Sequence, residues 1–177
     1  MLTFVYGGSA SGKSEYAEQL AADWSSKQNV PLMYLATMCA NDVESQQRIQ
    51  RHIAMRGDKP FQTIEVSHQI AAVALPKNSV VLLECLSNLL ANELFRERQS
   101  AFSITALLED VLHLASLCTH LIIVSNELFS DGIIYDKGTT QYLAHLGFLH
   151  QQICTKAHTV TEVVCGIPLH HKKGGLL

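Results

Sequence analysis

The chain has 177 residues, of which 47% are hydrophobic and 16% charged, and its formal net charge is −3. This length fills one hydrophobic core and is short for two, so we expect a single domain over residues 1–177. The mildly acidic balance excludes a general basic field of the kind that gathers nucleic acid or anionic lipid. Any anion must therefore bind at a local site.

Cysteine usage and the apolar runs bear on where the protein works. The five cysteines are widely spaced and form no CxxC pair. This pattern predicts buried, reduced thiols and a cytoplasmic location. No basic stretch precedes the first apolar run, and no run reaches the roughly 20 residues of a membrane span. We therefore expect no signal peptide, no membrane segment and no nucleic-acid partner.

Short apolar runs alternate with longer segments of helical spacing. The apolar runs predict strands at residues 2–6, 31–37, 79–85, 120–126 and 158–166. The helical spacing predicts helices at residues 14–27, 41–56, 85–97, 101–117 and 138–156. This order predicts an α/β fold with a mostly parallel sheet, helices on both faces, and ligands at the carboxyl ends of the strands. The final HHKKGGLL is expected to fray.

The stretch GGSASGKS follows the first predicted strand and opens the first predicted helix. Its spacing is the complete GxxxxGK[ST] phosphate-loop pattern, in which backbone N–H groups curl around phosphate oxygens. Lys13 is expected to reach the outer phosphates, and the Ser14 hydroxyl to bind Mg²⁺. The strand-to-helix context disfavours the alternative of an ordinary turn with an accidental lysine. The loop consists of Gly7, Gly8, Ser9, Ala10, Ser11, Gly12, Lys13 and Ser14.

Glu84 lies at the end of the apolar run SVVLLEC. A carboxylate at the end of a buried strand is unfavourable unless a cation or water compensates it. Glu84 is therefore a candidate second ligand of Mg²⁺, and a side chain that simply reaches solvent is the alternative. Together with the loop it predicts a site for a magnesium-bound nucleoside triphosphate.

The stretch NDVESQQRIQRHIAMRG carries Arg48, His52 and Arg56 at intervals of four. This spacing puts all three on one face of the predicted helix. Protonation of a histidine between two arginines is disfavoured, which leaves an imidazole nitrogen free to attack phosphorus. From the spacing alone, an exposed basic stripe with a surface histidine is nevertheless the favoured interpretation.

Seven motifs occur in an order and spacing that resemble one enzyme family: GGSASGKSEYAE, YLAT, RIQRH, FQTIE, LLECLSNLLANELF, IIVSNE and VVCGIPLHHK. The chain resembles the bifunctional adenosylcobinamide kinase/adenosylcobinamide-phosphate guanylyltransferases of cobalamin synthesis, from residue 3 to about 172. The resemblance implies a phosphate-loop α/β domain assembled as a homotrimer. It also implies two reactions. GTP or ATP phosphorylates adenosylcobinamide, and GMP then passes from GTP through a histidine to adenosylcobinamide phosphate.

The resemblance assigns residues by matching position. It makes His52 the guanylylated residue, which reverses the interpretation from spacing alone. For Thr37, a strand-end hydroxyl that makes no nucleotide contact is an equally favoured interpretation. For Glu65, an exposed strand residue without a functional role is equally favoured. Outside the phosphate loop, the implied nucleotide contacts are Ala36, Thr37, Met38, Ile53, Ala54, Met55, Arg56, Glu65 and Glu84.

Several positions depart from the family pattern. Ala10 stands where the family has an arginine, and LFSDGII after Asn126 and Glu127 is one residue longer than usual and lacks a proline. In the last predicted helix, two arginines, an aspartate and an asparagine are replaced by Thr140, Leu143, Ala144 and His150. Two alternatives therefore stay open: an enzyme with kinase activity alone, and a catalytically impaired protein that binds nucleotide or corrinoid.

Overall fold

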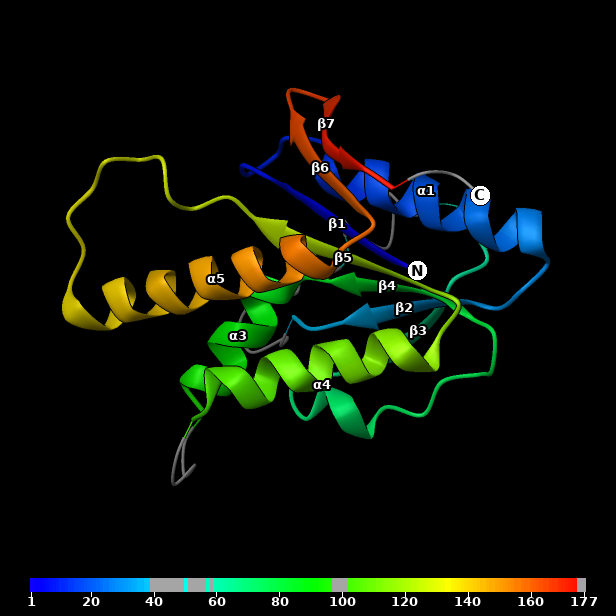
Figure 1. The fold of residues 1–177 in the computed structure, drawn as a ribbon, viewed down its shortest axis with the longest axis horizontal. Helices are drawn as coiled ribbons and strands as arrows, with labels where there is room; N and C mark the ends of the chain where they lie inside the picture. The colour runs from blue at the N-terminus through cyan, green and yellow to red at the C-terminus, as the bar shows by residue number, and fades with distance from the viewer. Residues whose placement is uncertain (39–49, 51–56, 58, 97–101, 175–177) are drawn as a thin grey trace.

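The structure is a computed structural model that describes residues 1–38, 50, 57, 59–96 and 102–174 (Figure 1). The described strands form one seven-stranded sheet in the order β3-β2-β4-β5-β1-β6-β7. The strands are β1 (Leu2–Gly7), β2 (Leu32–Ala36), β3 (Gln62–Glu65), β4 (Val80–Glu84), β5 (His120–Asn126), β6 (Thr159–Val164) and β7 (Ile167–Lys173). The helices are α1 (Lys13–Gln28), α3 (Leu86–Leu94), α4 (Ile104–Leu117) and α5 (Lys137–Lys156), with a 3-10 turn η1 (Ile70–Ala72).

The sheet is parallel except for its last pair of strands. β1 pairs in parallel with β5 and β6, β4 with β2 and β5, and β2 with β3. β6 and β7 pair antiparallel. The carboxyl ends of the parallel strands therefore meet at one edge, and the predicted mostly parallel α/β fold is confirmed.

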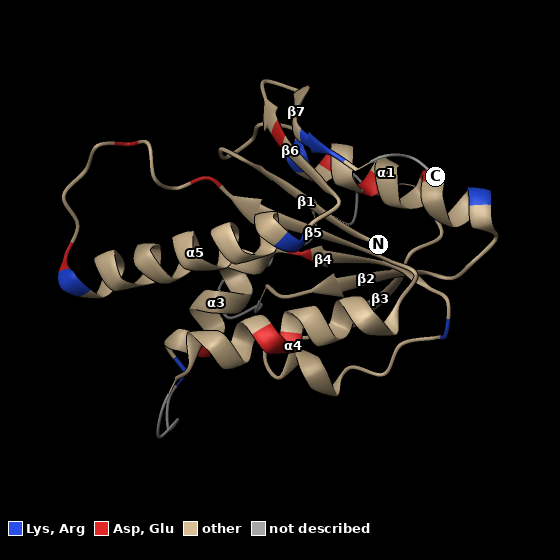
Figure 2. Ribbon diagram, in the orientation of Figure 1, with Lys and Arg blue, Asp and Glu red and all other residues tan. Residues whose placement is uncertain are grey.

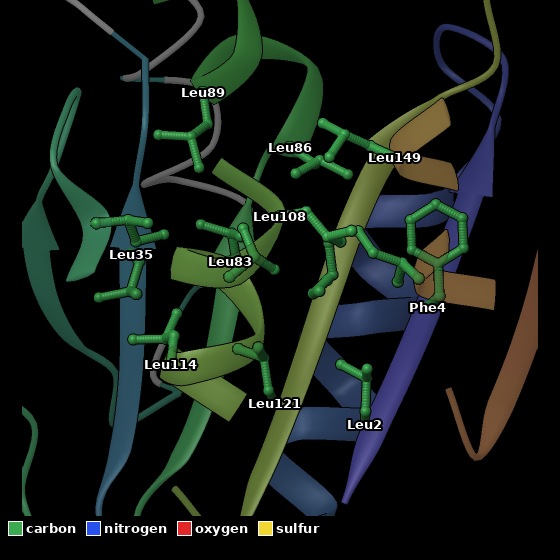
Figure 3. Close-up of a cluster of buried hydrophobic side chains, with 14 of the residues drawn as sticks. Leu2, Phe4, Leu35, Leu83, Leu86, Leu89, Leu108, Leu114, Leu121 and Leu149 are labelled. Atoms are coloured by element: carbon green, nitrogen blue, oxygen red, sulfur yellow. The ribbon is translucent and has the colours of Figure 1, made fainter. Parts of the chain in front are cut away.

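Helices cover both faces of the sheet (Figure 1). Alternate strand residues point to opposite faces, as they must in a pleated sheet. Val5, Tyr34 and Leu82 pack in the cluster that includes Ala17 and Ala21 of α1. The neighbouring Phe4, Leu35 and Leu83 pack in the cluster that includes leucines of α3, α4 and α5, among them Leu89, Leu114 and Leu149 (Figure 3). Burial on both faces explains why these strands are apolar at successive positions.

The C-terminal strand differs from the prediction. Residues 170–173 were expected to fray, but they belong to β7, where His170 pairs with Thr161. Cys165 and Gly166 join β6 to β7, and both have positive φ, at 51° and 80°. Two such residues match the twist of a hairpin. The prediction was wrong because β7 is mostly exposed, so its hydrophobic pattern carries no strand signal.

The predicted burial of the cysteines is confirmed only in part. Cys85 is buried, Cys118 and Cys154 are partly buried, and Cys165 is exposed in the hairpin turn. Cys39 and nearly all of the predicted helix 41–56 lie outside the described residues. Among the residues that the structure describes, no helix combines the length and the apolar character that a membrane crossing requires.

Candidate active site

The phosphate loop connects β1 to α1 and lies against the β6–β7 hairpin. A Cβ added to Gly7 would lie 2.4 Å from the Val163 carbonyl oxygen, so no larger residue fits there. Gly12 has a φ of 90°, and an added Cβ would lie 3.2 Å from the Cα of Gly166. The Gly166 N–H donates to the Ser11 carbonyl at 2.8 Å, which fixes the loop to the hairpin turn. Glycine is therefore required at positions 7 and 12 for steric reasons.

The structure brings Ser14 into contact with Glu84, and Lys13 directly precedes Ser14 at the start of α1. The Lys13 side chain is buried, with 8% of the residue exposed, and its Nζ donates to the Gly8 carbonyl oxygen at 3.1 Å. The Ser14 hydroxyl donates to Glu84 Oε1 at 2.8 Å. The fold thus brings together a serine at the start of α1 and a glutamate at the end of β4, which are 70 residues apart in the sequence.

The pair Ser14 and Glu84 suits a magnesium ion. Both side chains offer oxygen, the donor that Mg²⁺ prefers. The Ser14 hydroxyl and Glu84 Oε1 lie 2.8 Å apart, within hydrogen-bond distance, so both oxygens face the same point. The donor set therefore fits Mg²⁺, and Ser14 and Glu84 are the residues that would hold it.

Thr37 joins the ends of β2 and β4. The residue is fully buried, and its hydroxyl accepts a hydrogen bond from the Cys85 N–H at 2.7 Å and donates to backbone carbonyl oxygen of Glu84 or Cys85. Its N–H donates to the Glu84 carbonyl at 2.9 Å. Asn92 of α3 donates to the Thr37 carbonyl at 2.7 Å. The Thr37 hydroxyl therefore positions the Glu84 backbone, which agrees with the alternative of a strand-end hydroxyl.

Other predicted contacts lie along the same sheet edge. Ala36 pairs with Glu84 on one side and with Glu65 on the other, so the ends of β4, β2 and β3 form a row. The Glu65 side chain is exposed, and Met38 follows Thr37 at the end of this row. His52 and the positions 53–56 lie outside the described residues.

A hydrogen-bonded network beside Glu84 could not be recognised from the sequence. The Asn126 Nδ2 at the end of β5 donates to Ser87 Oγ at 2.8 Å, and Tyr142 of α5 donates to the Ser87 carbonyl at 3.1 Å. Burial raises the pKa of the Tyr142 phenol to about 12, so it stays a donor at neutral pH. Burial, and secondly the Glu84 charge, raise the pKa of the Cys85 thiol. The sequence feature that could have pointed to Asn126 is the IIVSNE motif, in which a polar residue ends an apolar strand.

One of the departures in the last helix, His150, lines a pocket on the opposite side of β1 from α1. His150 lies against Phe4 at a ring-centroid distance of 4.9 Å, and its Nε2 is 2.8 Å from Ser125 Oγ. Burial lowers the pKa of His150 to about 4, so the ring is neutral near pH 7. A pocket of about 440 Å³ is lined by Phe4, Tyr6, Glu127, Phe129, Ser130, His150, Gln151, Cys154 and Glu162. Figure 2 shows acidic residues spaced along the segment from β5 to α5 that borders it.

Ala10 adopts a conformation that glycine would accept more easily. Its φ is 56°, in the left-handed region that disfavours side chains by about 1–2 kcal/mol. We expect Ala10→Gly to raise the free energy of unfolding by ~0.5–1 kcal/mol, since the greater freedom of unfolded glycine offsets part of the gain. Urea denaturation measures the change. The matched variant Ala22→Gly, inside α1, should lower stability by about 1 kcal/mol. Equal losses in both variants would contradict the assigned backbone conformation.

The comparisons with known proteins agree on one family. A family model described as cobinamide kinase / cobinamide phosphate guanyltransferase matches residues 3–171. The bifunctional adenosylcobalamin biosynthesis protein CobP of Pseudomonas aeruginosa is 32% identical over 174 residues, covering 96% of both chains. The bifunctional adenosylcobalamin biosynthesis protein CobU of Escherichia coli is 29% identical, covering 94% of this chain and 97% of its own.

The structural comparison supports the fold alone. A solved structure of an ATPase domain has a TM-score of 0.51 at 11% sequence identity, covering 91% of this chain and 68% of that chain. It confirms the predicted phosphate-loop NTPase-like α/β fold. Because the family model spans nearly the whole chain and the Pseudomonas relative matches it end to end, the chain belongs to the cobinamide kinase / cobinamide phosphate guanyltransferase family.

Proposed function

We propose that this protein is a Mg²⁺-dependent and GTP-dependent transferase that phosphorylates adenosylcobinamide and then transfers GMP from GTP to adenosylcobinamide phosphate. The observation that carries the proposal is the 2.8 Å contact between Ser14 and Glu84 beside the buried Lys13, in a chain of this family. These residues supply what a phosphate-loop transferase needs in order to bind a triphosphate. ATP is the alternative phosphoryl donor for the first step.

In the first reaction, the chain positions the phosphates. The backbone N–H groups of the loop and the Lys13 ammonium hold the β- and γ-phosphates, and Ser14 and Glu84 would hold Mg²⁺. When bound, the ion neutralises charge on the phosphate that departs. The hydroxyl of the aminopropanol arm attacks the γ-phosphorus, the bond to the β-phosphate oxygen breaks, and the hydroxyl proton is released to solvent.

In the second reaction, we assign the nucleophile to His52. A neutral imidazole nitrogen attacks the α-phosphorus of GTP, and pyrophosphate leaves with the bonding electrons. A phosphate oxygen of adenosylcobinamide phosphate then attacks the same phosphorus, and the nitrogen–phosphorus bond breaks. The adduct replaces one difficult displacement by two easier steps. The homotrimer implied by the resemblance and the cytoplasmic location predicted from the cysteine pattern belong to this proposal.

Intact-protein mass after incubation with Mg-GTP tests the nucleophile. We expect wild-type protein to gain one guanylyl group, and His52→Ala to gain none, because only an unprotonated side-chain nitrogen can form the adduct. His113→Ala, on the exposed side of α4, is the matched control and should gain the group like the wild type. Folded, GTP-binding wild-type protein without an adduct would exclude guanylyl transfer.

Two product assays separate the alternatives. Phosphorylation of adenosylcobinamide without an adduct would identify a kinase that lacks the second activity. GTP binding without either reaction would identify a nucleotide-binding relative, and would point to Leu143 and Ala144, where the family has an arginine and an aspartate.

A further inference from the structure

The pocket beside His150 lies at the end of β1, on the face of the sheet that α5 covers. Tyr6 of β1 lines it, and so does Glu162 of β6, which pairs with Tyr6. The residue after Tyr6 is Gly7, the first residue of the phosphate loop. Glu127, which also lines the pocket, donates its N–H to the Gly7 carbonyl at 2.9 Å. A molecule in this pocket therefore lies next to the proposed phosphate site.

The pocket is acidic. Among the described residues that line it, Glu127 and Glu162 are carboxylates, and none is a lysine or an arginine. Both described hydrogen bonds to the Glu127 side chain use Oε1, and Glu162 Oε2 lies 3.0 Å from His171 Nε2. Because an ionised carboxylate has about four acceptor positions, both groups can accept further N–H donors. His150 is neutral near pH 7 and adds no positive charge. The lining therefore favours a cation that carries N–H groups.

An open apolar face continues from the pocket across β6 and β7, the last two strands of the sheet (Figure 1). Leu169 pairs with Glu162, and Ile167 pairs with Val164, two residues further along β6. Paired residues point to the same face of a sheet, so all four side chains lie on the pocket side. Val164, Ile167 and Leu169 are 42%, 62% and 44% exposed, so the described part of the chain leaves this face uncovered. We call the pocket and this face the β1–β6 surface, which consists of Tyr6, Glu127, Glu162, Val164, Ile167 and Leu169.

We propose that the β1–β6 surface binds the acceptor corrinoid, with one edge of its macrocycle in the acidic pocket and its flat ring across the apolar face. The inference rests on the proposed function, which makes adenosylcobinamide the acceptor. That molecule is a flat ring with a net positive charge and primary amide arms. Its charge and its N–H groups match Glu127 and Glu162, and its ring matches the exposed apolar side chains. The pocket adjoins Gly7, so the hydroxyl arm of a corrinoid bound there is near the loop that holds the phosphates.

Corrinoid affinity tests the charge match without any reaction. The probes are adenosylcobinamide, a cation, and dicyanocobinamide, whose two cyanide ligands cancel the charge of the ring and metal. Each is titrated at pH 7.5 into the wild type and into Glu127→Gln/Glu162→Gln, which keeps the shape of both side chains. We expect affinity to fall by about 10-fold for adenosylcobinamide and by about threefold or less for dicyanocobinamide, because only the cation loses a charge interaction. Affinity for a non-hydrolysable Mg-GTP analogue should stay within about twofold, because no donor to phosphate is removed.

Two further variants separate a binding surface from a general effect. Asp23→Asn/Glu109→Gln removes two exposed carboxylates, on α1 and α4, and should leave both corrinoid affinities unchanged. Ser130→Trp puts a bulky side chain at the exposed rim of the pocket and should weaken both corrinoids alike, by about 10-fold or more. The glutamine variant alone decides if the tryptophan variant does not fold. Unchanged affinity for adenosylcobinamide in the folded glutamine variant would overturn the inference, and so would equal losses for the two corrinoids.

The outcomes also distinguish this inference from the proposed function and from another occupant. Charge-dependent binding of adenosylcobinamide to a protein that transfers neither phosphate nor GMP would support the β1–β6 surface and refute the transferase. An active wild type whose corrinoid affinity is unchanged in the variants would do the reverse. If a second copy of this chain covers the surface instead, Leu169→Asp should change the oligomeric state in sedimentation and leave corrinoid affinity unaltered, which would overturn the inference. A wild-type protein that binds no corrinoid would refute both.

Discussion

Glu84→Gln is expected to lower phosphoryl transfer by at least about 100-fold while leaving the fold intact. Glutamine has the shape of glutamate, and its amide oxygen can still accept the Ser14 hydrogen bond seen at 2.8 Å. It lacks the negative charge that would hold Mg²⁺ against the phosphates. The measurement is the initial rate of product formation as a function of Mg²⁺ concentration. We expect the midpoint of that curve to move to higher Mg²⁺.

The control for Glu84 removes a carboxylate elsewhere. Glu109→Gln, on the exposed side of α4, changes the net charge equally and should leave the rate unchanged. Retention of nearly full activity by Glu84→Gln would show that the carboxylate does not serve the reaction. A rate that recovers fully at high Mg²⁺ would show that the loss lies in ion affinity alone.

Acidification from pH 7.5 to pH 5 is expected to lower the free energy of unfolding by about 2–4 kcal/mol through one buried and one partly buried histidine, His120 and His150. Burial lowers the pKa of His120 and of His150 to about 4, from an ordinary value of 6.5. Both rings are therefore neutral in the folded protein, whereas the unfolded chain takes up protons below pH 6.5. Their stabilising effect is complete above pH 6.5 and is lost as the pH falls from 6.5 to 4. Urea denaturation at each pH measures the change.

The surroundings of the two rings set the size of this effect. The amino terminus and His158 lower the pKa of His120 further, whereas Glu127 opposes the shift at His150. His120 also contacts Thr3 and Trp24, so its removal would disturb packing. His150→Asn keeps a polar side chain beside Ser125 and should remove about half of the pH dependence. A pH dependence as steep as that of the wild type would show that His150 is already protonated in the folded state.

The fold and the phosphate loop were predictable because their signals are local. Continuous apolar runs at β4 and β5 reflect burial on both faces of the sheet, and the alternation with helices fixes a parallel arrangement. β7 was not predictable, since its edge position leaves most of its side chains in solvent. The missed hairpin matters for the site, because Gly166 bonds to the loop at Ser11.

The sequence by itself determined the phosphate loop, because a strand, a loop with glycine at positions 7 and 12, and a helix form one continuous segment. It also indicated Glu84, since a carboxylate at the end of a buried strand needs compensation. Only the tertiary structure decided that Ser14 and Glu84 lie 2.8 Å apart and that Asn126 pairs with Gly7. It also decided that the Thr37 hydroxyl is hydrogen-bonded to the backbone of residues 84 and 85. The physical reason is that the register between strands distant in the chain depends on packing across the whole sheet, and no local spacing encodes it.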